Sequence, residues 1–308
     1  MKISEKDIIE IISKNNNFRE EILVEIGQDA SVIFPKQDSY IITTTDTMVL
    51  NTHFESNIKP YDLGYIAAAS NISDLSAMGA HPAFALINLT IENPTKEYIE
   101  NIVDGYNSVF KNYPVSIIGG DTTFGPTSLT MTLIGYSNDD NFMPTSNAKV
   151  GDIIFVSGYI GESLALKKEK KYNLPICRNE LGKLLPEYAN CCTDMSDGIF
   201  ASLNSIMEKS AIGIDIQVEN IPISNNVKNL LNNNSITWED ILSYGEDYEL
   251  IFTINEEKIN IFKSLCKNIG IDIYEIGKIR KHKKININLN NKLMNINTKK
   301  KFEHFRND

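Results

Sequence analysis

The first half of the chain alternates between helical spacing of apolar residues and short strand-like runs. Isoleucines recur at helical spacing within residues 5–13, and three consecutive asparagines follow as a breaker. Residues 60–78 are rich in alanine and serine, which predicts a helix packed closely against its neighbours. The pattern predicts helices over residues 5–13, 60–78 and 95–111, and strands over residues 31–34, 40–44, 83–91, 115–118 and 129–136, the first two strands being joined by a turn.

The second half repeats this mixture of strands and helices. Its pattern predicts strands over residues 152–157, 213–218, 249–253 and 271–276, and helices from Gly161 and over residues 198–209 and 256–268. Because strands and helices alternate in both halves, we expect an α/β fold built of α+β layers. The order of the strands within a sheet stays open at this point.

A polar stretch without periodicity separates the two halves. It covers residues 138–149 and contains Pro144. A chain of 308 residues is long enough for two domains with separate cores. We therefore predict an N-terminal α/β domain over residues 1–137 and a C-terminal α/β domain over residues 138–308.

The chain is acidic, with a formal net charge of −10 and a sequence pI of about 5.0. Nucleic-acid binders are expected to be basic, so we expect no nucleic-acid partner, and we interpret the Lys- and Asn-rich residues 278–301 as a solvated surface with weak strands. No apolar run approaches the ~20 residues of a membrane helix, and the first ten residues lack a signal-peptide core. Four cysteines without C-x-x-C spacing indicate reduced thiols. We expect a cytoplasmic protein without a membrane segment.

Six short acidic clusters are the main candidates for chemistry, and most of them end or adjoin a predicted strand. They are Gly27-Gln28-Asp29-Ala30, Thr43-Thr44-Thr45-Asp46-Thr47, Asn71-Ile72-Ser73-Asp74-Leu75, Gly119-Gly120-Asp121-Thr122-Thr123, Asp194-Met195-Ser196-Asp197-Gly198 and Gly245-Glu246-Asp247-Tyr248-Glu249-Leu250. Aspartate is a poor strand residue and is costly to bury. Repeated carboxylates at strand ends therefore indicate a common cationic partner, and their hard oxygen ligands suit Mg²⁺ that also binds a phosphate.

Most clusters also have a structural explanation, which the residues alone leave open. The threonine run fits a strand edge with a turn aspartate, the two glycines before Asp121 fit a plain turn, and Ser196 or Asp197 fits a helix N-cap. Asp74 favours a ligand role, because it interrupts a predicted helix that looks largely buried. His53 is the only histidine near an acidic cluster, and no P-loop, H-E-x-x-H or G-x-S-x-G motif occurs.

Taken together and in this order, the clusters resemble the thiamine-monophosphate kinase family, part of the aminoimidazole ribonucleotide synthetase-like superfamily. The resemblance runs over most of the chain, and its most specific pieces are Thr45-Asp46-Thr47, Asn71 to Ala80, Gly119 to Thr123, Ser196-Asp197-Gly198 and Gly245 to Leu250. It implies a two-domain fold with the N-terminal sheet at a homodimer interface. It also implies ATP- and Mg²⁺-dependent phosphorylation of thiamine phosphate to thiamine diphosphate.

The resemblance also implies roles for individual residues. Implied ligands of several Mg²⁺ ions are Asp29, Thr44, Thr45, Asp46, Asp74, Asp121, Asp194 and Asp197. Implied contacts to ATP are Gly120, Asp121 and Ser196, and implied contacts to thiamine phosphate are His53, Glu246 and Phe302. No side chain is expected to act as an acid or a base, because metal ions and positioning carry such a transfer.

The chain departs from the family pattern at one acidic position and at two positions where arginines are expected. Gln28 replaces an aspartate, Phe124 replaces an arginine, and Thr145 or Ser146 occupies a second arginine position. Two alternatives therefore stay open. One is another enzyme of the superfamily, although a selenophosphate synthetase would need a reactive cysteine before Cys177. The other is a non-catalytic or divergent nucleotide-binding member.

Overall fold

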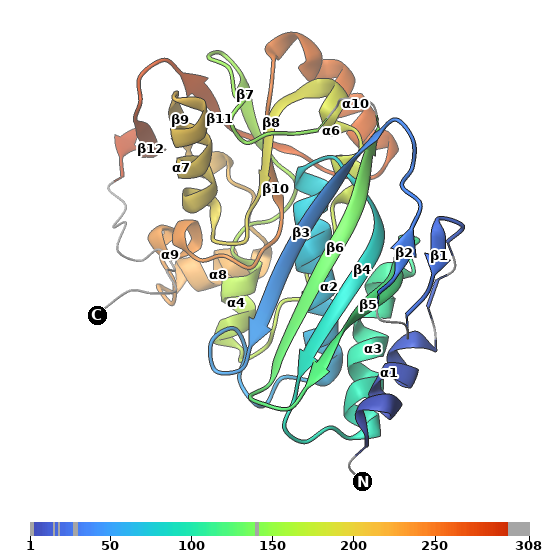
Figure 1. Cartoon of the computed structure of the whole chain (residues 1–308). Coiled ribbons are helices and arrows are strands. Elements are labelled where there is room, and N and C mark those ends of the chain that lie inside the picture. Colours follow the sequence, from blue (N-terminus) through green and yellow to red (C-terminus); the bar gives the residue numbers. More distant parts are fainter. Residues whose placement is uncertain (1–2, 15, 18, 27–29, 139–141, 295–308) are drawn as a thin grey trace. The chain divides into compact units, whose positions relative to one another are not determined.

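The computed structural model describes residues 3–14, 16–17, 19–26, 30–138 and 142–294 (Figure 1). The chain divides into two compact units. The first contains Met1–Leu75 and Ala80–Asn141, and the second contains Ser76–Gly79 and Phe142–Asp308. The boundary expected between residues 137 and 138 stays a prediction. No helix within the described ranges is long and apolar enough to cross a membrane.

The first unit is built on a four-stranded sheet with the strand order β3-β6-β4-β5. Strands β4 and β5 are parallel, and the other two neighbouring pairs are antiparallel. The elements that begin in this unit are α1 (Glu5–Ser13), β1 (Ile22–Val24), β2 (Val32–Ile33), β3 (Ser39–Val49), α2 (Pro60–Ala77), β4 (His81–Thr90), α3 (Lys96–Phe110), β5 (Ser116–Thr123) and β6 (Ser128–Asn138).

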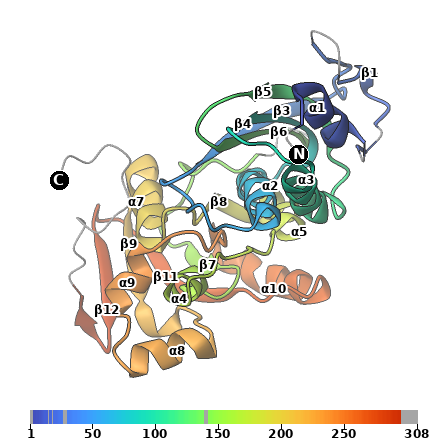
Figure 2. The ribbon, with the colours of Figure 1, turned by 90° about the horizontal axis from the view of Figure 1, so that it is seen from below.

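Helices α2 and α3 cover one face of this sheet (Figures 1 and 2). Two glycines allow the helices to approach closely. A Cβ atom on Gly64 would lie 2.0 Å from the carbonyl oxygen of Ile102, and one on Gly105 would lie 2.1 Å from that of Tyr61. Side chains at these positions would force the helices apart, so glycine is required for the close packing of α2 against α3.

The second unit contains a seven-stranded mixed sheet with the order β13-β12-β9-β11-β7-β10-β8. Its elements are β7 (Ile153–Val156), α4 (Glu162–Lys168), α5 (Asn179–Gly182), α6 (Leu185–Tyr188), β8 (Ala189–Asp194), α7 (Ile199–Ser210), β9 (Gly213–Gln217), η1 (Val218–Asn220), α8 (Asn225–Asn232), α9 (Trp238–Ser243), β10 (Leu250–Ile254), η2 (Glu256–Lys258), α10 (Ile259–Asn268), β11 (Tyr274–Arg280), β12 (Ile285–Leu289) and β13 (Lys292–Leu293).

The central strands of this sheet are buried on both faces. Every residue of β7 and β10 is buried, which matches their continuous apolar sequences. Ile154 faces one core cluster with residues of α7, whereas Phe155 and Phe252 face another with Phe262 of α10. The rings of Phe155 and Phe252 stack with centroids 5.8 Å apart. The two clusters hold β8 and β10 in place, and the candidate site residues of this unit lie at the end of β8 and just before the start of β10.

The structure confirms the long predicted helices and most strands, and it corrects three details. The strands predicted at residues 31–34 and 40–44 do not pair with each other, because β2 pairs with β1 and β3 pairs with β6. The strand predicted at residues 115–118 continues to Thr123, since Gly119 and Gly120 pair in register with β4 across a bulge. The strand predicted at residues 271–276 is shifted to Tyr274–Arg280.

Candidate active site

Thr44 and Asp46 project from β3 toward the face of the sheet that the helices cover. Both are partly buried, whereas the alternating residues Thr43, Thr45 and Thr47 are exposed. The Thr44 hydroxyl donates a hydrogen bond to Asp74 Oδ2 on α2. The structure thus brings together three of the residues that the resemblance implies as metal ligands, and we call Thr44, Asp46 and Asp74 the Asp74 group.

The Asp74 group has the electrostatics of a cation site. Burial raises the pKa of Asp74 to about 6; the hydrogen bond from Thr44 lowers it, and the negative charge of Asp46 raises it further. A divalent cation would remove the repulsion between the two carboxylates, and their hard oxygens fit Mg²⁺. Within the described ranges, no three His, Cys, Asp or Glu side chains are grouped to hold a metal ion. An ion at the Asp74 group would therefore take further oxygens from water and phosphate, as Mg²⁺ commonly does.

We expect the metal-free protein to lose stability between about pH 4 and pH 7. Folded Asp74 keeps its proton up to a pKa of about 6, whereas the reference value for an aspartate is 3.8. Between these values the folded state binds more protons than the unfolded state, so rising pH favours unfolding by roughly 2–3 kcal/mol from this group. Urea unfolding in EDTA at about pH 4 and pH 7.5 measures the change in the free energy of unfolding.

Asp74→Asn is the matched control, because it has no titrating group at this position. The difference in pH dependence between wild type and variant isolates Asp74. Identical pH dependence in the two proteins would contradict the raised pKa. Adding Mg²⁺ to the wild type at the higher pH should restore the lost stability, since bound cation stabilises the folded state by mass action.

Thr45 and Asp121 lie on the opposite face of the same sheet. The Thr45 hydroxyl is 2.9 Å from the Thr132 hydroxyl of β6. Asp121 pairs in register with Asn88 of β4, and both residues are exposed on the face that α2 and α3 leave uncovered. Successive side chains of a strand point to opposite faces, so within this unit these two predicted ligands are separate from the Asp74 group.

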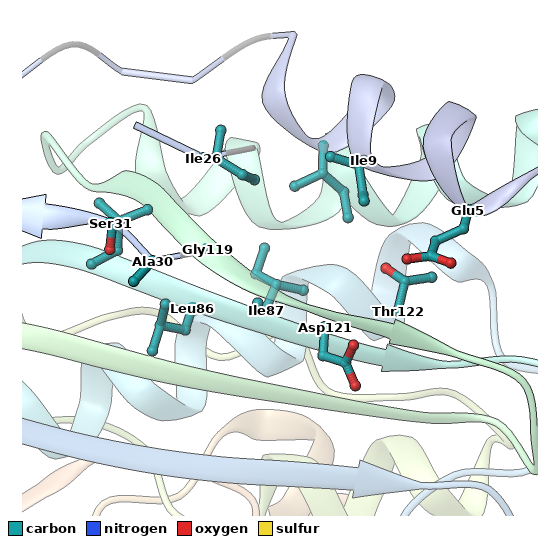
Figure 3. Close-up of a pocket in the computed structure, with 13 residues that line it drawn as sticks. Glu5, Ile9, Ile26, Ala30, Ser31, Leu86, Ile87, Gly119, Asp121 and Thr122 are labelled. Atoms are coloured by element: carbon teal, nitrogen blue, oxygen red, sulfur yellow. The ribbon is translucent and has the colours of Figure 1, made fainter. Parts of the chain in front are cut away.

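A pocket of about 570 Å³ lies between α1 and the edge strand β5 (Figure 3). Gly119, Gly120 and Asp121 line it from β5, and Glu5 of α1 points toward Thr122 across it. A Cβ atom at position 120 would lie 1.8 Å from the carbonyl oxygen of Ile87, so glycine is required for this approach of β5 to β4. As β5 is the edge strand, half of its backbone groups point away from β4, and the Asn16 side chain bonds those of Ile117.

His53 lies in the turn that follows β3. Its Nδ1 atom accepts a hydrogen bond of 3.0 Å from the backbone N–H of Val49. This contact orients the imidazole ring and assigns the proton of the neutral form to Nε2. His53 therefore has an orientation that is set by its own turn.

In the second unit, Asp194, Ser196 and Asp197 lie on the connection between β8 and α7, which we call the Asp194 loop (residues 194–198). Asp194 is the last residue of β8. The N-cap of α7 is Gly198, with φ of 91° and no side-chain cap hydrogen bond. The alternative explanation of Ser196 or Asp197 as the N-cap is therefore wrong, and both of these residues are exposed.

The Asp194 loop contacts a second loop, residues 245–249, which we call the Glu246 loop. The backbone N–H of Glu246 donates a 2.8 Å hydrogen bond to the carbonyl oxygen of Ser196. A Cβ atom on Gly245 would lie only 1.9 Å from that same oxygen, so the contact requires glycine. The fold thus brings Ser196 and Glu246, predicted contacts to ATP and to substrate, into adjacent positions.

The acidic residues of the Glu246 loop differ in their surroundings. Asp247 is buried and accepts hydrogen bonds from the backbone N–H groups of Gly161 and Ser163 and from the Ser163 hydroxyl. Glu249 is buried and forms a two-bond ion pair with Arg178. Glu246 alone of the three is exposed. The sequence interpretation missed Arg178, because an ion pair across 71 residues leaves no local pattern.

The remaining predicted positions either lie outside the described residues or lie on exposed or connecting segments. Asp29, Phe302 and the substituted Gln28 lie outside the described residues. Phe124 is 81% exposed between β5 and β6, where an arginine was expected. The Thr145 hydroxyl donates to the carbonyl oxygen of Cys192 at 3.4 Å.

Comparisons with known proteins agree with the resemblance of the motifs. Models of the AIR synthase related protein N-terminal and C-terminal domains match residues 27–137 and 150–290. Thiamine-monophosphate kinase of Buchnera aphidicola subsp. Acyrthosiphon pisum is 34% identical over 324 residues, covering 99% of this chain and 100% of that protein.

Solved structures show the same relationship. The crystal structure of thiamine-monophosphate kinase from Stenotrophomonas maltophilia has a TM-score of 0.84 and 29% identity, covering 93% of this chain and 97% of that one. AaThiL complexed with AMPPCP and TMP has a TM-score of 0.75 and 27% identity, covering 88% of this chain and 89% of that one. With both domain models matched and relatives similar over their whole length, the chain belongs to the thiamine-monophosphate kinase family, within the AIR synthase related proteins.

Proposed function

We propose that this chain transfers the γ-phosphoryl group of ATP to thiamine monophosphate, which yields thiamine diphosphate and ADP. The observation that carries this proposal is the Asp74 group, a carboxylate pair suited to a divalent cation, in a chain that belongs to this kinase family. A related structure that contains both AMPPCP and TMP supports the same pair of substrates.

The reaction requires little from acid or base side chains. The acceptor is a phosphate oxygen, which is already a nucleophile, so positioning and charge neutralisation lower the barrier. Bound Mg²⁺ supplies that neutralisation by sharing the charge of the phosphate oxygens. This fits a site that is rich in aspartate and places no lysine among its predicted residues.

We propose the metal ligands from the family resemblance. The structure supports some of these ligands more directly than others. Thr44, Asp46 and Asp74 are supported by the hydrogen bond from Thr44 to Asp74 and by the charge of Asp46, which acts on Asp74. The full proposed set is Asp29, Thr44, Thr45, Asp46, Asp74, Asp121, Asp194 and Asp197. The side chains of the Asp74 group would hold one ion, and the other residues would serve further ions.

The substrate contacts follow the same logic. Gly120, Asp121 and Ser196 are proposed for ATP, supported by the exposed backbone of the edge strand β5 and by the exposed Ser196. Glu246, His53 and Phe302 are proposed for thiamine monophosphate. Glu246 is supported by its exposure, since its neighbours Asp247 and Glu249 are already engaged within the fold.

We also propose a homodimer that forms through the uncovered face of the first unit's sheet. This face carries exposed Ile41 beside the row of threonines on β3. Large apolar side chains on an uncovered sheet face are typical of an association surface.

A product assay tests the proposed activity directly. Purified protein with thiamine monophosphate, ATP and Mg²⁺ should form ADP and thiamine diphosphate in equal amounts. Omission of Mg²⁺ should abolish the reaction, and a parallel preparation of Asp74→Asn excludes a contaminating kinase. Binding of both substrates without turnover would contradict the proposal and would assign the chain to the non-catalytic members of the superfamily.

A further inference from the structure

The backbone of Glu246 has a left-handed conformation that hydrogen bonds to neighbouring residues hold in place. Its φ is 67°, and that of Tyr248 is 52°, in a region that side chains other than glycine rarely adopt. The Glu246 N–H bonds to Ser196, and the Glu246 carbonyl oxygen accepts a 2.8 Å hydrogen bond from Asn173 Nδ2. Strain of this kind persists where the surroundings determine the conformation, and it is frequent at binding sites.

The carboxylate of Glu246 is positioned separately, by Tyr244. The Tyr244 hydroxyl donates a 2.9 Å hydrogen bond to Glu246 Oε2. An exposed glutamate side chain otherwise has considerable rotamer freedom, which must be lost when it binds a substrate. A fixed hydroxyl at this distance reduces that loss.

Tyr244 is itself well anchored. Its backbone N–H bonds to Asp240 as the cap of α9, and its ring packs against the core cluster that contains Ile241 and Leu242. The ammonium group of Lys167 lies 4.8 Å from the ring centroid. Burial, followed by the negative charge of Glu246, raises the pKa of Tyr244, so its hydroxyl remains a proton donor.

We propose that Tyr244 is a positioning residue, which orients the Glu246 carboxylate toward an amine donor of the substrate. Among the described residues, Oε2 receives the tyrosine hydroxyl and Oε1 receives no donor. The pyrimidine ring of thiamine carries an exocyclic amine, the kind of donor that a carboxylate oxygen accepts. This inference rests on the proposed function and adds a residue that sets recognition of the thiamine moiety.

The first test is Tyr244→Phe, which removes the hydroxyl and keeps the ring and its contact with Lys167. We expect KM for thiamine monophosphate to rise about tenfold, corresponding to about 1.4 kcal/mol, while kcat and KM for ATP stay within about twofold. Tyr188→Phe is the matched control, because it also removes one tyrosine hydroxyl in the second unit, on a ring that packs on Phe262. An unchanged KM in Tyr244→Phe would overturn the proposal.

A double-mutant cycle separates positioning from direct contact or loss of structure. If Tyr244 acts through Glu246, then Tyr244→Phe should change KM little further in a Glu246→Ala background. Additive effects of the two substitutions would overturn the positioning role. Calorimetric binding of thiamine monophosphate should show the same pattern without turnover.

The outcomes also distinguish this inference from the proposed function. If the wild type phosphorylates thiamine monophosphate and Tyr244→Phe behaves as wild type, only the role of Tyr244 fails. If the wild type neither binds nor phosphorylates it, both proposals fail. If the wild type binds without turnover, the calorimetric cycle still decides the role of Tyr244.

Discussion

Replacing Asp74 with asparagine should lower kcat for thiamine diphosphate formation on the order of 10³-fold or more, while the protein stays folded. Asp74 converges with Thr44 and Asp46, and the neutral amide removes one of the two charges that would hold a cation there. A displaced cation no longer aligns the phosphates of donor and acceptor. Such positioning is the main contribution that this enzyme class makes to the rate.

Although Asp74→Asn should lower kcat, it should raise the stability of the metal-free protein. In the metal-free protein at about pH 7.5, Asp74→Asn should unfold at higher urea than wild type, because the repulsion between Asp74 and Asp46 is gone. Initial rates at saturating Mg²⁺, combined with urea unfolding, give both quantities. Asp104→Asn on α3 is the control, since Asp104 is exposed and lies outside the proposed site. Activity of Asp74→Asn within a few-fold of wild type would refute the assignment.

Replacing Arg178 with methionine should destabilise the protein by about 3–5 kcal/mol, the second large effect that we expect. Arg178 donates from Nε and Nη2 to the two oxygens of Glu249, each at 2.6 Å. The side chains are only 15% and 9% exposed, respectively. Loss of the guanidinium leaves a buried carboxylate whose one remaining donor among the described residues is the Ser157 hydroxyl. An uncompensated buried charge is far more costly than a lost surface ion pair.

A second substitution tests that reason. Arg178→Met combined with Glu249→Leu should recover most of the lost stability, because the unpaired charge is removed together with its partner. The comparison is Arg280→Met, which breaks a 2.7 Å pair with Asp215 whose side chains are 49% and 27% exposed. That change should cost less than about 1 kcal/mol. Urea unfolding measures all three, and a double variant no more stable than Arg178→Met would show that packing, not charge, dominates.

The sequence alone determined the elements whose signals are local. Helix α3 starts where Thr95 accepts a hydrogen bond from the Tyr98 N–H, and its apolar stripe faces the core as the helical spacing predicted. Strand β10 was predicted over residues 249–253, four of which are apolar or threonine, and the structure places it one residue further on, at Leu250–Ile254, with every residue buried. The two-domain family fold was also recognisable, because its motifs occur in a fixed order along the chain.

Strand pairing, in contrast, was decided by the tertiary structure. A turn at residues 35–39 suggests a hairpin, yet β3 forms its ladder with β6, nearly 90 residues away. From the sequence, Gly119 and Gly120 were expected to end a strand. In the structure both pair with β4, so β5 continues through them. Partners that lie far apart in sequence compete with local preferences, and the buried sheet face decides the outcome.

The candidate site, too, was predicted only in part from the sequence. The clusters identified which segments carry carboxylates, but not which carboxylates face a ligand. Thr44 and Thr45 are neighbours in sequence and lie on opposite faces of β3, a consequence of the two-residue period of a strand.

Within one five-residue loop, Glu246 is exposed, Asp247 binds the start of α4, and Glu249 pairs with Arg178. The partners of the last two lie 84 and 71 residues away. A buried carboxylate needs a partner, and that partner can lie anywhere in the sequence. Only the folded structure therefore distinguishes carboxylates with a structural partner from those that remain available to a substrate.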